Sequence, residues 1–339
     1  MSRRALITGV GGQDGSLLAE LLLGQEYDVL GVTRDARPHQ NLRSVADRVQ
    51  VVQCDLHDLP SVERLLDSCR PTEVYNLAAP SFSPDSWNDP AGTVQTAAGA
   101  VAVQLEAIRR LDPTIRFYQA SSSEIFGLPL ESPQTETTPV RPVTPYGAAK
   151  ACGHFLVQGY RRRYGLFACS GILYNHESER RALHFLPRKV AHGAAAIALG
   201  LQDELRLGNL DARRDWGSAH DYVRAMWQML LHPEPDDYVI ATGTVHSVED
   251  LVACAFERAG LDWTRYVRVD PELARGKDER RDVVGDSSKA REVLGWHITV
   301  PFEEIVHRLV DSELRRLAAT QLSANRVTGS SSSSEPAKS

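Results

Sequence analysis

Short apolar runs alternate with longer amphipathic segments through the first half of the chain. The apolar runs are rich in β-forming residues and cover residues 5–8, 29–32, 49–54, 74–76, 115–120 and 168–173. The segments between them place apolar residues at helical spacing, as at Leu17, Leu18, Leu21 and Leu22. This alternation predicts an α/β fold with a doubly wound parallel sheet, whose ligands bind at the carboxyl ends of the strands.

The pattern loosens after residue 174. Helical spacing returns at residues 183–200, 218–231, 247–259 and 302–319, with short extended pieces between. We expect a large domain over residues 1–174, to which later segments return, and a smaller mixed α/β domain over residues 175–320. Residues 321–339 end in a polar run of low complexity, so this tail is expected to be disordered.

Composition narrows the kind of ligand. The 339 residues carry a formal charge of −6 and include 42% hydrophobic residues, which is enough for a large core. No basic block points to nucleic acid or to an anionic membrane surface. The longest apolar stretch, residues 190–201, is too short to span a bilayer, and the chain opens without a signal-peptide pattern. A cytoplasmic protein that binds a small molecule is expected.

Cysteine and histidine usage gives no sign of metal chemistry. The five cysteines are scattered without CxxC spacing, as expected of reduced thiols that serve in packing. The eleven histidines form no HxxxH pair or histidine–cysteine cluster, so no metal site is expected.

The first candidate for chemistry is a glycine trio between the first strand and the first helix. Gly9, Gly12 and Gly15 stand three residues apart in "LITGVGGQDGSLLAELL". Glycines there permit a tight turn and close approach of a pyrophosphate to the free N–H groups of a helix N-terminus. The position between strand and helix favours a Rossmann-type dinucleotide site over an ordinary turn.

Residues after the second and third strands bear on which dinucleotide binds. Thr33 and Arg34, with Arg37 nearby, suit the 2′-phosphate of NADP, whereas NAD would favour an acidic residue there. Asp35 leaves a solvated charged loop as the alternative. Asp55, after the third strand, could accept a hydrogen bond from the adenine amine or could cap a helix.

A second motif supplies a candidate base. Tyr146 and Lys150, in "TPYGAAK", are four residues apart and project from one face of a helix. A nearby ammonium and an oxidised nicotinamide would both favour the phenolate, which could then take a proton from a hydroxyl. The alternative is a surface pair on a helix.

The glycine trio, the hydroxyl-bearing strand end "SSSEIFG" and the YxxxK motif, in this order, resemble the extended short-chain dehydrogenase/reductase family. Longer strings resemble the GDP-mannose 4,6-dehydratases within that family, over residues 4 to 310. These strings include "ALITGVGGQDGSLLAELLL", "FYQASSSEIFG", "TPYGAAKA", "GILYNHESERR", "LGNLDARRDWG" and "GDSSKAREVLGW".

The resemblance implies a redox cycle that closes on itself. Members oxidise the sugar at C4 with NADP⁺, lose water across C5 and C6, and return the hydride to C6. The net reaction is that of a hydro-lyase. Glu124 would take the C5 proton and help the C6 hydroxyl leave, because a C5 proton is acidic beside a carbonyl. Ser122 would bind the C4 oxygen beside Tyr146, and Ser123 would support it. Helix capping by the serines and Glu124 is the alternative.

The resemblance also implies the binding residues. Those for NADP are Gly9, Gly12, Gln13, Asp14, Gly15, Arg34, Asp55, Leu56, Leu77, Ala78, Ala79, Ser81, Tyr146, Lys150, His176 and Arg181. Those for the GDP-sugar are Ser81, Glu124, Asn175, Arg188, Lys189 and Arg214, whose cations suit a diphosphate. The alternative for the basic residues is a solvated helix face. Domain 1–174 would thus bind NADP, and domain 175–320 would mainly bind substrate.

Several positions depart from the family pattern. Ser122 stands where threonine is usual, while Pro80 and Phe82 stand where glutamine and histidine are common, near the cofactor and sugar. A larger GDP-linked manno-heptose is therefore an alternative substrate. A related reductase or epimerase, and a non-catalytic NADP-binding partner, remain further alternatives. The segment after Arg34 is shortened where relatives contact a neighbouring subunit, so a homo-oligomer is expected as either a dimer or a tetramer.

Overall fold

The computed structural model describes residues 3–34, 39–273 and 283–329. Seven parallel strands form the main sheet in the order β10-β6-β5-β4-β1-β2-β3. Their bounds are β1 (Arg4–Thr8), β2 (Asp28–Thr33), β3 (Val49–Gln53), β4 (Glu73–Asn76), β5 (Arg116–Ala120), β6 (Ala168–Leu173) and β10 (Asp237–Ile240). The predicted doubly wound parallel sheet is confirmed, and β10 adds a strand that the sequence pattern did not predict.

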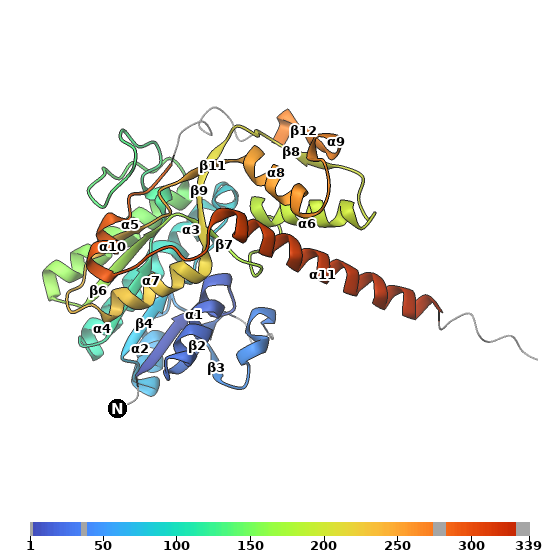
Figure 1. The fold of residues 1–339 in the computed structure, drawn as a ribbon. Helices are drawn as coiled ribbons and strands as arrows, with labels where there is room; N and C mark the ends of the chain where they lie inside the picture. Colours follow the sequence, from blue (N-terminus) through green and yellow to red (C-terminus); the bar gives the residue numbers. More distant parts are fainter. Residues whose placement is uncertain (1–2, 35–38, 274–282, 330–339) are drawn as a thin grey trace, which may run out of the picture.

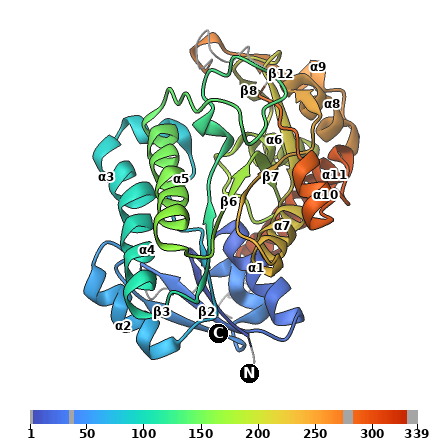
Figure 2. The same ribbon diagram turned by 90° about the vertical axis from the view of Figure 1, so that its left-hand side faces the viewer.

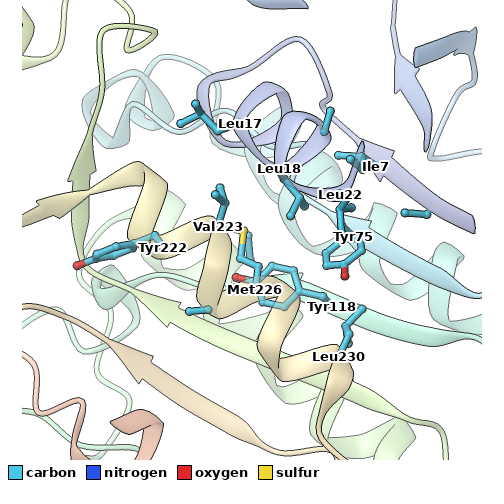
Figure 3. Close-up of a cluster of buried hydrophobic side chains, with 14 of the residues drawn as sticks. Ile7, Leu17, Leu18, Leu22, Tyr75, Tyr118, Tyr222, Val223, Met226 and Leu230 are labelled. Carbon is cyan, nitrogen blue, oxygen red and sulfur yellow. The ribbon is translucent and has the colours of Figure 1, made fainter. Parts of the chain in front are cut away.

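Helices cover both faces of this sheet (Figures 1 and 2). Helices α1 (Gln13–Gly24) and α7 (Ala219–Leu231) pack on one face, while α2 (Leu59–Cys69), α4 (Ala100–Leu111) and α5 (Pro145–Tyr164) pack on the other. Alternate strand residues face opposite cores, with Tyr75 and Tyr118 toward α1 and α7 and Val74 and Phe117 toward α2 and α4. Figure 3 shows the first core, in which α1 and α7 face each other through Leu17, Leu18, Leu22, Val223, Met226 and Leu230.

A second, smaller core lies beside the carboxyl ends of the strands. Strands β7 (Asn175–Glu177), β9 (Arg213–Ser218) and β11 (Val245–Ser247) form one sheet, and β8 (Leu205–Leu207) pairs with β12 (Val267–Val269). Helices α6 (Leu186–Ala198), α8 (Val248–Arg258) and α11 (Phe302–Gly329) pack on one another, with α9 (Trp263–Tyr266) beside α8. The expected helix at 183–200 begins only at Leu186, because Pro187 occupies its first turn.

The remaining elements are shorter helical segments. They are α3 (Pro90–Val94), α10 (Ser288–Leu294), the π-helix η3 (Gln95–Gly99) and the 3₁₀ helices η1 (Gln40–Val45), η2 (Ser83–Trp87), η4 (Ser123–Ile125) and η5 (Pro271–Leu273). Helix α11 continues to Gly329, so residues 321–329 are helical where a disordered tail was expected. Its sequence "LAATQLSANR" contains neither glycine nor proline to end the helix earlier. Residues 330–339 lie outside the described residues.

Within the described part of the chain, no helix has the length and apolar character that crossing a bilayer requires. The same residues contain no group of three or more histidine, cysteine or carboxylate side chains arranged to hold a metal ion.

Candidate active site

One large cavity opens at the carboxyl ends of the central strands. Its volume of about 430 Å³ lies in the range of small-molecule sites. The wall includes residues from the main sheet and from the smaller core. The sequence-predicted residues that line it are Asp14, Leu77, Ala79, Ser81, Ser122, Ser123, Glu124, Tyr146, Lys150, Asn175, His176, Arg181, Lys189 and Arg214.

The first turns of helix α5 bring Tyr146 and Lys150 to the cavity. Thr144 caps this helix, since its side chain accepts the N–H of Gly147 at 3.0 Å, and Pro145 starts it. Both functional side chains are buried, with Tyr146 only 7% and Lys150 only 5% exposed. The Lys150 ammonium donates to the carbonyl of Ala120 at 2.8 Å and lies 5.7 Å from the centre of the Tyr146 ring.

Burial disfavours the charged form of each of these two residues. It raises the pKa of Tyr146 to about 12, against the lowering effect of a hydrogen bond with Ser122. It lowers the pKa of Lys150 to about 8, against the opposing charge of Asp14. In the protein alone, burial therefore outweighs the lowering of the Tyr146 pKa that was expected from its cationic neighbour.

A short 3₁₀ turn aims Glu124 at the same cavity. Ser122 caps this turn, because its Oγ accepts the N–H of Glu124 at 3.2 Å, while it also bonds to Tyr146. Helix α5 packs against this turn at Gly147, where an added Cβ would lie 2.5 Å from the carbonyl oxygen of Glu124. Ser122 thus caps the turn and also contacts Tyr146, so the capping role and the catalytic role expected for this serine are compatible.

The glycine loop lies at the start of α1. Gly9 has φ of +70°, and a Cβ on Gly15 would lie 2.4 Å from the Gly9 carbonyl oxygen. Gly12 precedes the helix and offers no capping side chain, so the first N–H groups of α1 are left for a ligand. Leu77 and Ala78 lie against this loop, where both N–H groups donate to Thr8 Oγ1.

Two predicted cofactor residues at the loop use their side chains within the protein. Gln13 donates to the carbonyl of His176 at 3.1 Å and accepts from Ser178 at 2.9 Å. Asp14 forms a 2.9 Å ion pair with His176. These contacts join α1 to strand β7 across the edge of the cavity.

The strand ends expected to bind the adenosine half lie outside this cavity. Arg34 is exposed, and its carbonyl accepts from Gln53 at 2.8 Å. Asp55 accepts from the N–H of His57 at 3.0 Å, and the capping role belongs instead to Asp58, which caps α2. Leu56 packs against the core beneath the sheet. Asp35 and Arg37 lie outside the described residues.

Of the arginines and lysines after strand β6 that were expected near the cofactor and sugar nucleotide, three line the cavity and one does not. Arg181 stacks 3.6 Å from the centre of the Phe185 ring, and Lys189 donates to the carbonyl of Arg206. Arg214 lies on β9 and lines the cavity. The structure does not bring Arg188 to this wall, because its guanidinium donates at 2.9 Å to Glu313 of α11, which is fully buried.

The sequence of the chain matches a known family over almost its whole length. The profile of the family described as GDP-mannose 4,6 dehydratase matches residues 6–309. GDP-mannose 4,6 dehydratase 2 of Arabidopsis thaliana is 44% identical over 91% of this chain and 86% of its own length. GDP-mannose 4,6-dehydratase of Vibrio cholerae is 40% identical over 93% of this chain and 95% of its own.

The chain belongs to the GDP-mannose 4,6-dehydratase family. Solved structures agree at the level of the fold. A dTDP-glucose 4,6-dehydratase from Streptomyces venezuelae, solved with NAD bound, superposes with a TM-score of 0.82. It is 23% identical and covers 93% of this chain and 98% of its own.

The cavity of this family member contains residues that the sequence reasoning did not select. They include Ser121, Glu177, His184, Phe185, Asn209 and Trp216. Trp216 could have been found, because it alternates with Arg214 on one face of strand β9. Of the two departures beside the sugar, Phe82 lines the cavity in edge-to-face contact with His184, whereas Pro80 is exposed and lies outside the lining.

Proposed function

We propose that this protein is a GDP-mannose 4,6-dehydratase, which converts GDP-mannose to GDP-4-keto-6-deoxymannose with loss of water. The observation that carries the proposal is Glu124, which lines one cavity together with Ser122, Tyr146 and Lys150. A reductase or an epimerase of this fold needs the tyrosine and the lysine, but not a second base. Membership of the family supports the same reaction.

The cofactor is NADP, and the glycine loop fits a dinucleotide. A Cβ on Gly15 would clash with the loop itself, and the uncapped N-terminus of α1 suits a pyrophosphate. When bound, NADP would supply the hydride acceptor for oxidation at C4 and, once reduced, the hydride donor for reduction at C6. Gly9, Gly12 and Gly15 would hold it, and Arg34 would lie near its 2′-phosphate.

Tyr146 performs the first proton transfer. Its phenolic oxygen takes the proton of the C4 hydroxyl as the hydride leaves, and Ser122 holds the C4 oxygen by a hydrogen bond. Lys150, fixed by the carbonyl of Ala120, favours the phenolate by its charge.

Glu124 performs the elimination. Once C4 is a carbonyl, the C5 proton is acidic, and the carboxylate of Glu124 removes it. The same carboxyl group then gives that proton to the departing C6 hydroxyl, so water leaves and the base is regenerated. The return of hydride to C6 is completed by a proton to C5, which balances the proton that Tyr146 took from the C4 hydroxyl. Asn175, Lys189 and Arg214 would bind the nucleotide diphosphate and sugar from the smaller core.

Variants of the two bases test this mechanism. Mixed with GDP-mannose and NADP⁺, the wild-type protein should form the 4-keto product without net change in NADPH. Glu124→Gln should accumulate reduced nicotinamide but no 6-deoxy product, because only elimination is blocked. Tyr146→Phe should slow both steps by about 10²- to 10⁴-fold, the usual contribution of a general base. Product analysis by mass spectrometry and nicotinamide absorbance measure the two steps.

The outcomes separate the alternatives. A wild-type rate in Glu124→Gln would show that another group is the base. Net consumption of NADPH would indicate a reductase, and NADP binding without turnover would indicate a non-catalytic protein. Faster turnover of GDP-manno-heptose than of GDP-mannose would indicate the larger sugar, which Phe82 in the cavity wall would then have to accommodate.

A homodimer is the proposed assembly. Ala148, Cys152 and Phe155 form an exposed stripe along one face of α5, and Val94 of the neighbouring α3 is also exposed. Phe155 is 52% exposed, although aromatic side chains favour burial. A second copy would cover this stripe.

The proposed roles of the two parts of the chain follow from their contacts. We propose that residues 1–174, joined by α7 and β10, form the NADP-binding part and that residues 175–320 otherwise mainly bind the sugar nucleotide. The five cysteines are free, as in proteins of a reducing compartment, which supports a cytoplasmic location.

A further inference from the structure

The imidazole of His176 lies between two groups that can only accept hydrogen bonds. Its Nε2 is 2.9 Å from Oδ2 of Asp14, and its Nδ1 is 2.7 Å from the carbonyl oxygen of Tyr174. A carboxylate and a carbonyl both require a donor. Each ring nitrogen must therefore carry a hydrogen, which makes His176 an imidazolium.

The surroundings favour this charge. The ring of His176 stacks on the fully buried ring of Tyr222 in α7, with centres 4.5 Å apart and planes 23° apart, as cations do on aromatic faces. Burial lowers the pKa of His176, but the carboxylate of Asp14 outweighs it, so the pKa is raised. Burial acts against Asp14 as well, yet His176 lowers the pKa of that carboxyl to about 2.

Other charged groups near the pair do not replace Asp14. Arg181 lowers the pKa of His176, and burial raises the pKa of Glu177 and so disfavours its charge. From α1, the uncharged amide of Gln13 donates to the backbone carbonyl of His176 and to Oδ1 of Asp14, where it helps to lower the pKa of that carboxyl. Asp14 is thus the charged partner that the imidazolium contacts directly.

We propose that Asp14 is a positioning residue that keeps His176 charged and thereby fixes strand β7 against the N-terminus of α1. Strand β7 carries Asn175 on the sugar side, and α1 follows the glycine loop on the cofactor side. Because both nitrogens of His176 are engaged, its side chain neither transfers a proton nor donates to the sugar. The effect on turnover rests on the proposed function, whereas the charge of His176 does not.

The substitution Asp14→Asn separates charge from shape. An asparagine can donate to Nε2, so neutral His176 keeps both contacts, with Nδ1 still donating to Tyr174. In ¹⁵N-histidine spectra of the NADP-bound protein at about pH 7.5, one unit above the ordinary histidine pKa, both nitrogens of His176 should be protonated. In Asp14→Asn only one should be. The signal is assigned by its loss in His176→Gln, and a single protonated nitrogen in the wild-type protein would overturn the proposal.

Turnover supplies the second readout. Asp14→Asn should lower kcat/KM for GDP-mannose by roughly 10- to 100-fold, because the neutral hydrogen bond that remains holds β7 against α1 less tightly than the charge-assisted one and lets the reacting groups shift. The alkaline limb of its pH profile should move to lower pH, because Asp14 opposes the burial that lowers the Lys150 pKa. The carboxylate control on the same helix is Glu20→Gln, which removes the charge that pairs with Arg180 and accepts from Ser44, away from His176, and should change neither readout.

Three results are decisive. Loss of the His176 charge in Asp14→Asn with unchanged kcat/KM and pH profile would overturn the positioning role. A charged His176 in both proteins would overturn the part assigned to Asp14. Failure of the wild-type protein to form the 4-keto product would reject the proposed function while leaving the nitrogen spectra interpretable by themselves.

Discussion

At the scale of single residues, the cavity contains buried titratable side chains whose charged forms are disfavoured by burial. Tyr146 and Lys150 are each buried, and burial opposes the phenolate of the one and the ammonium of the other. The hydrogen bond to the carbonyl of Ala120 fixes the Lys150 side chain, but the ammonium remains buried in the wall of the cavity. Residues placed in this way serve catalysis at a cost to stability.

Lys150→Met should therefore stabilise the fold while it slows catalysis. The folded protein binds fewer protons than the unfolded chain between pH 8 and 10.5, so the buried ammonium destabilises it below that window and wild-type stability rises through it. The gap between a pKa of 10.5 and about 8 corresponds to roughly 3 kcal/mol, and the lost hydrogen bond removes about 1. Urea unfolding at pH 7 should show a gain of about 2 kcal/mol.

The advantage of Lys150→Met should shrink as the pH rises from 8 toward 10.5, because the penalty for burying an ammonium falls through this window and vanishes above it, where the wild-type lysine is neutral in both states. Lys189→Met, at a half-buried lysine of the same cavity, is the control and should give no comparable gain. Lower stability of Lys150→Met at pH 7 would contradict the argument.

At the scale of elements, helix α5 combines three tasks. Its cap at Thr144 and the close approach at Gly147 set Tyr146 beside the Ser122 turn. Its buried face packs on the sheet, and its opposite face leaves the stripe at Ala148, Cys152 and Phe155 exposed. The position of the reacting phenol therefore depends on how this helix begins.

Removal of the cap should affect both stability and activity. Thr144→Ala should lower the free energy of unfolding by about 1 kcal/mol and also lower kcat, because the frayed first turn carries Tyr146. Thr144→Ser should restore both. Asp58→Ala, which removes the cap of α2, should cost similar stability with kcat unchanged. Chemical denaturation and steady-state kinetics make the comparison, and equal losses of kcat in the two cap variants would contradict it.

At the scale of the whole molecule, the cavity lies between the seven-stranded sheet and the smaller core. One hydrophobic core covers each face of the sheet, and the smaller core holds α6, α8 and α11 together. The buried carboxylate of Glu313 links α11 to α6 through Arg188 and His192. The sheet and the smaller core both contribute walls to the site, so the cofactor side and the sugar side are built by different parts of the chain.

The proposed dimer gives a prediction at this scale. Phe155→Glu should shift the protein from dimer to monomer in sedimentation velocity, because it places a charge in an apolar contact. Leu130→Glu is the control, since Leu130 is 77% exposed on a loop outside the proposed stripe and should leave the assembly unchanged. A dimer that persists in Phe155→Glu would place the contact elsewhere.

Local sequence was enough for several features. The alternation of strands and helices predicted the parallel sheet, because the spacing of apolar residues within each segment indicates which of its positions are buried. The motif residues at strand ends converge because parallel strands end at one edge. Strand β10 was missed, since four residues at 237–240 carry little periodicity and pair with β6 only in the folded chain.

Tertiary structure alone decided how the charged residues are used. Arg188 had the right type for a phosphate, but it pairs with Glu313, which lies 125 residues away in sequence. His176 and Asp14, separated by 162 residues, neutralise each other at the cavity wall. A long polar side chain can reach several partners, and the fold decides which of them lies within reach. Burial and neighbouring charges then decide whether the side chain is protonated. The sequence by itself therefore determined the scaffold and the candidate groups, while the packed chain determined their partners and protonation.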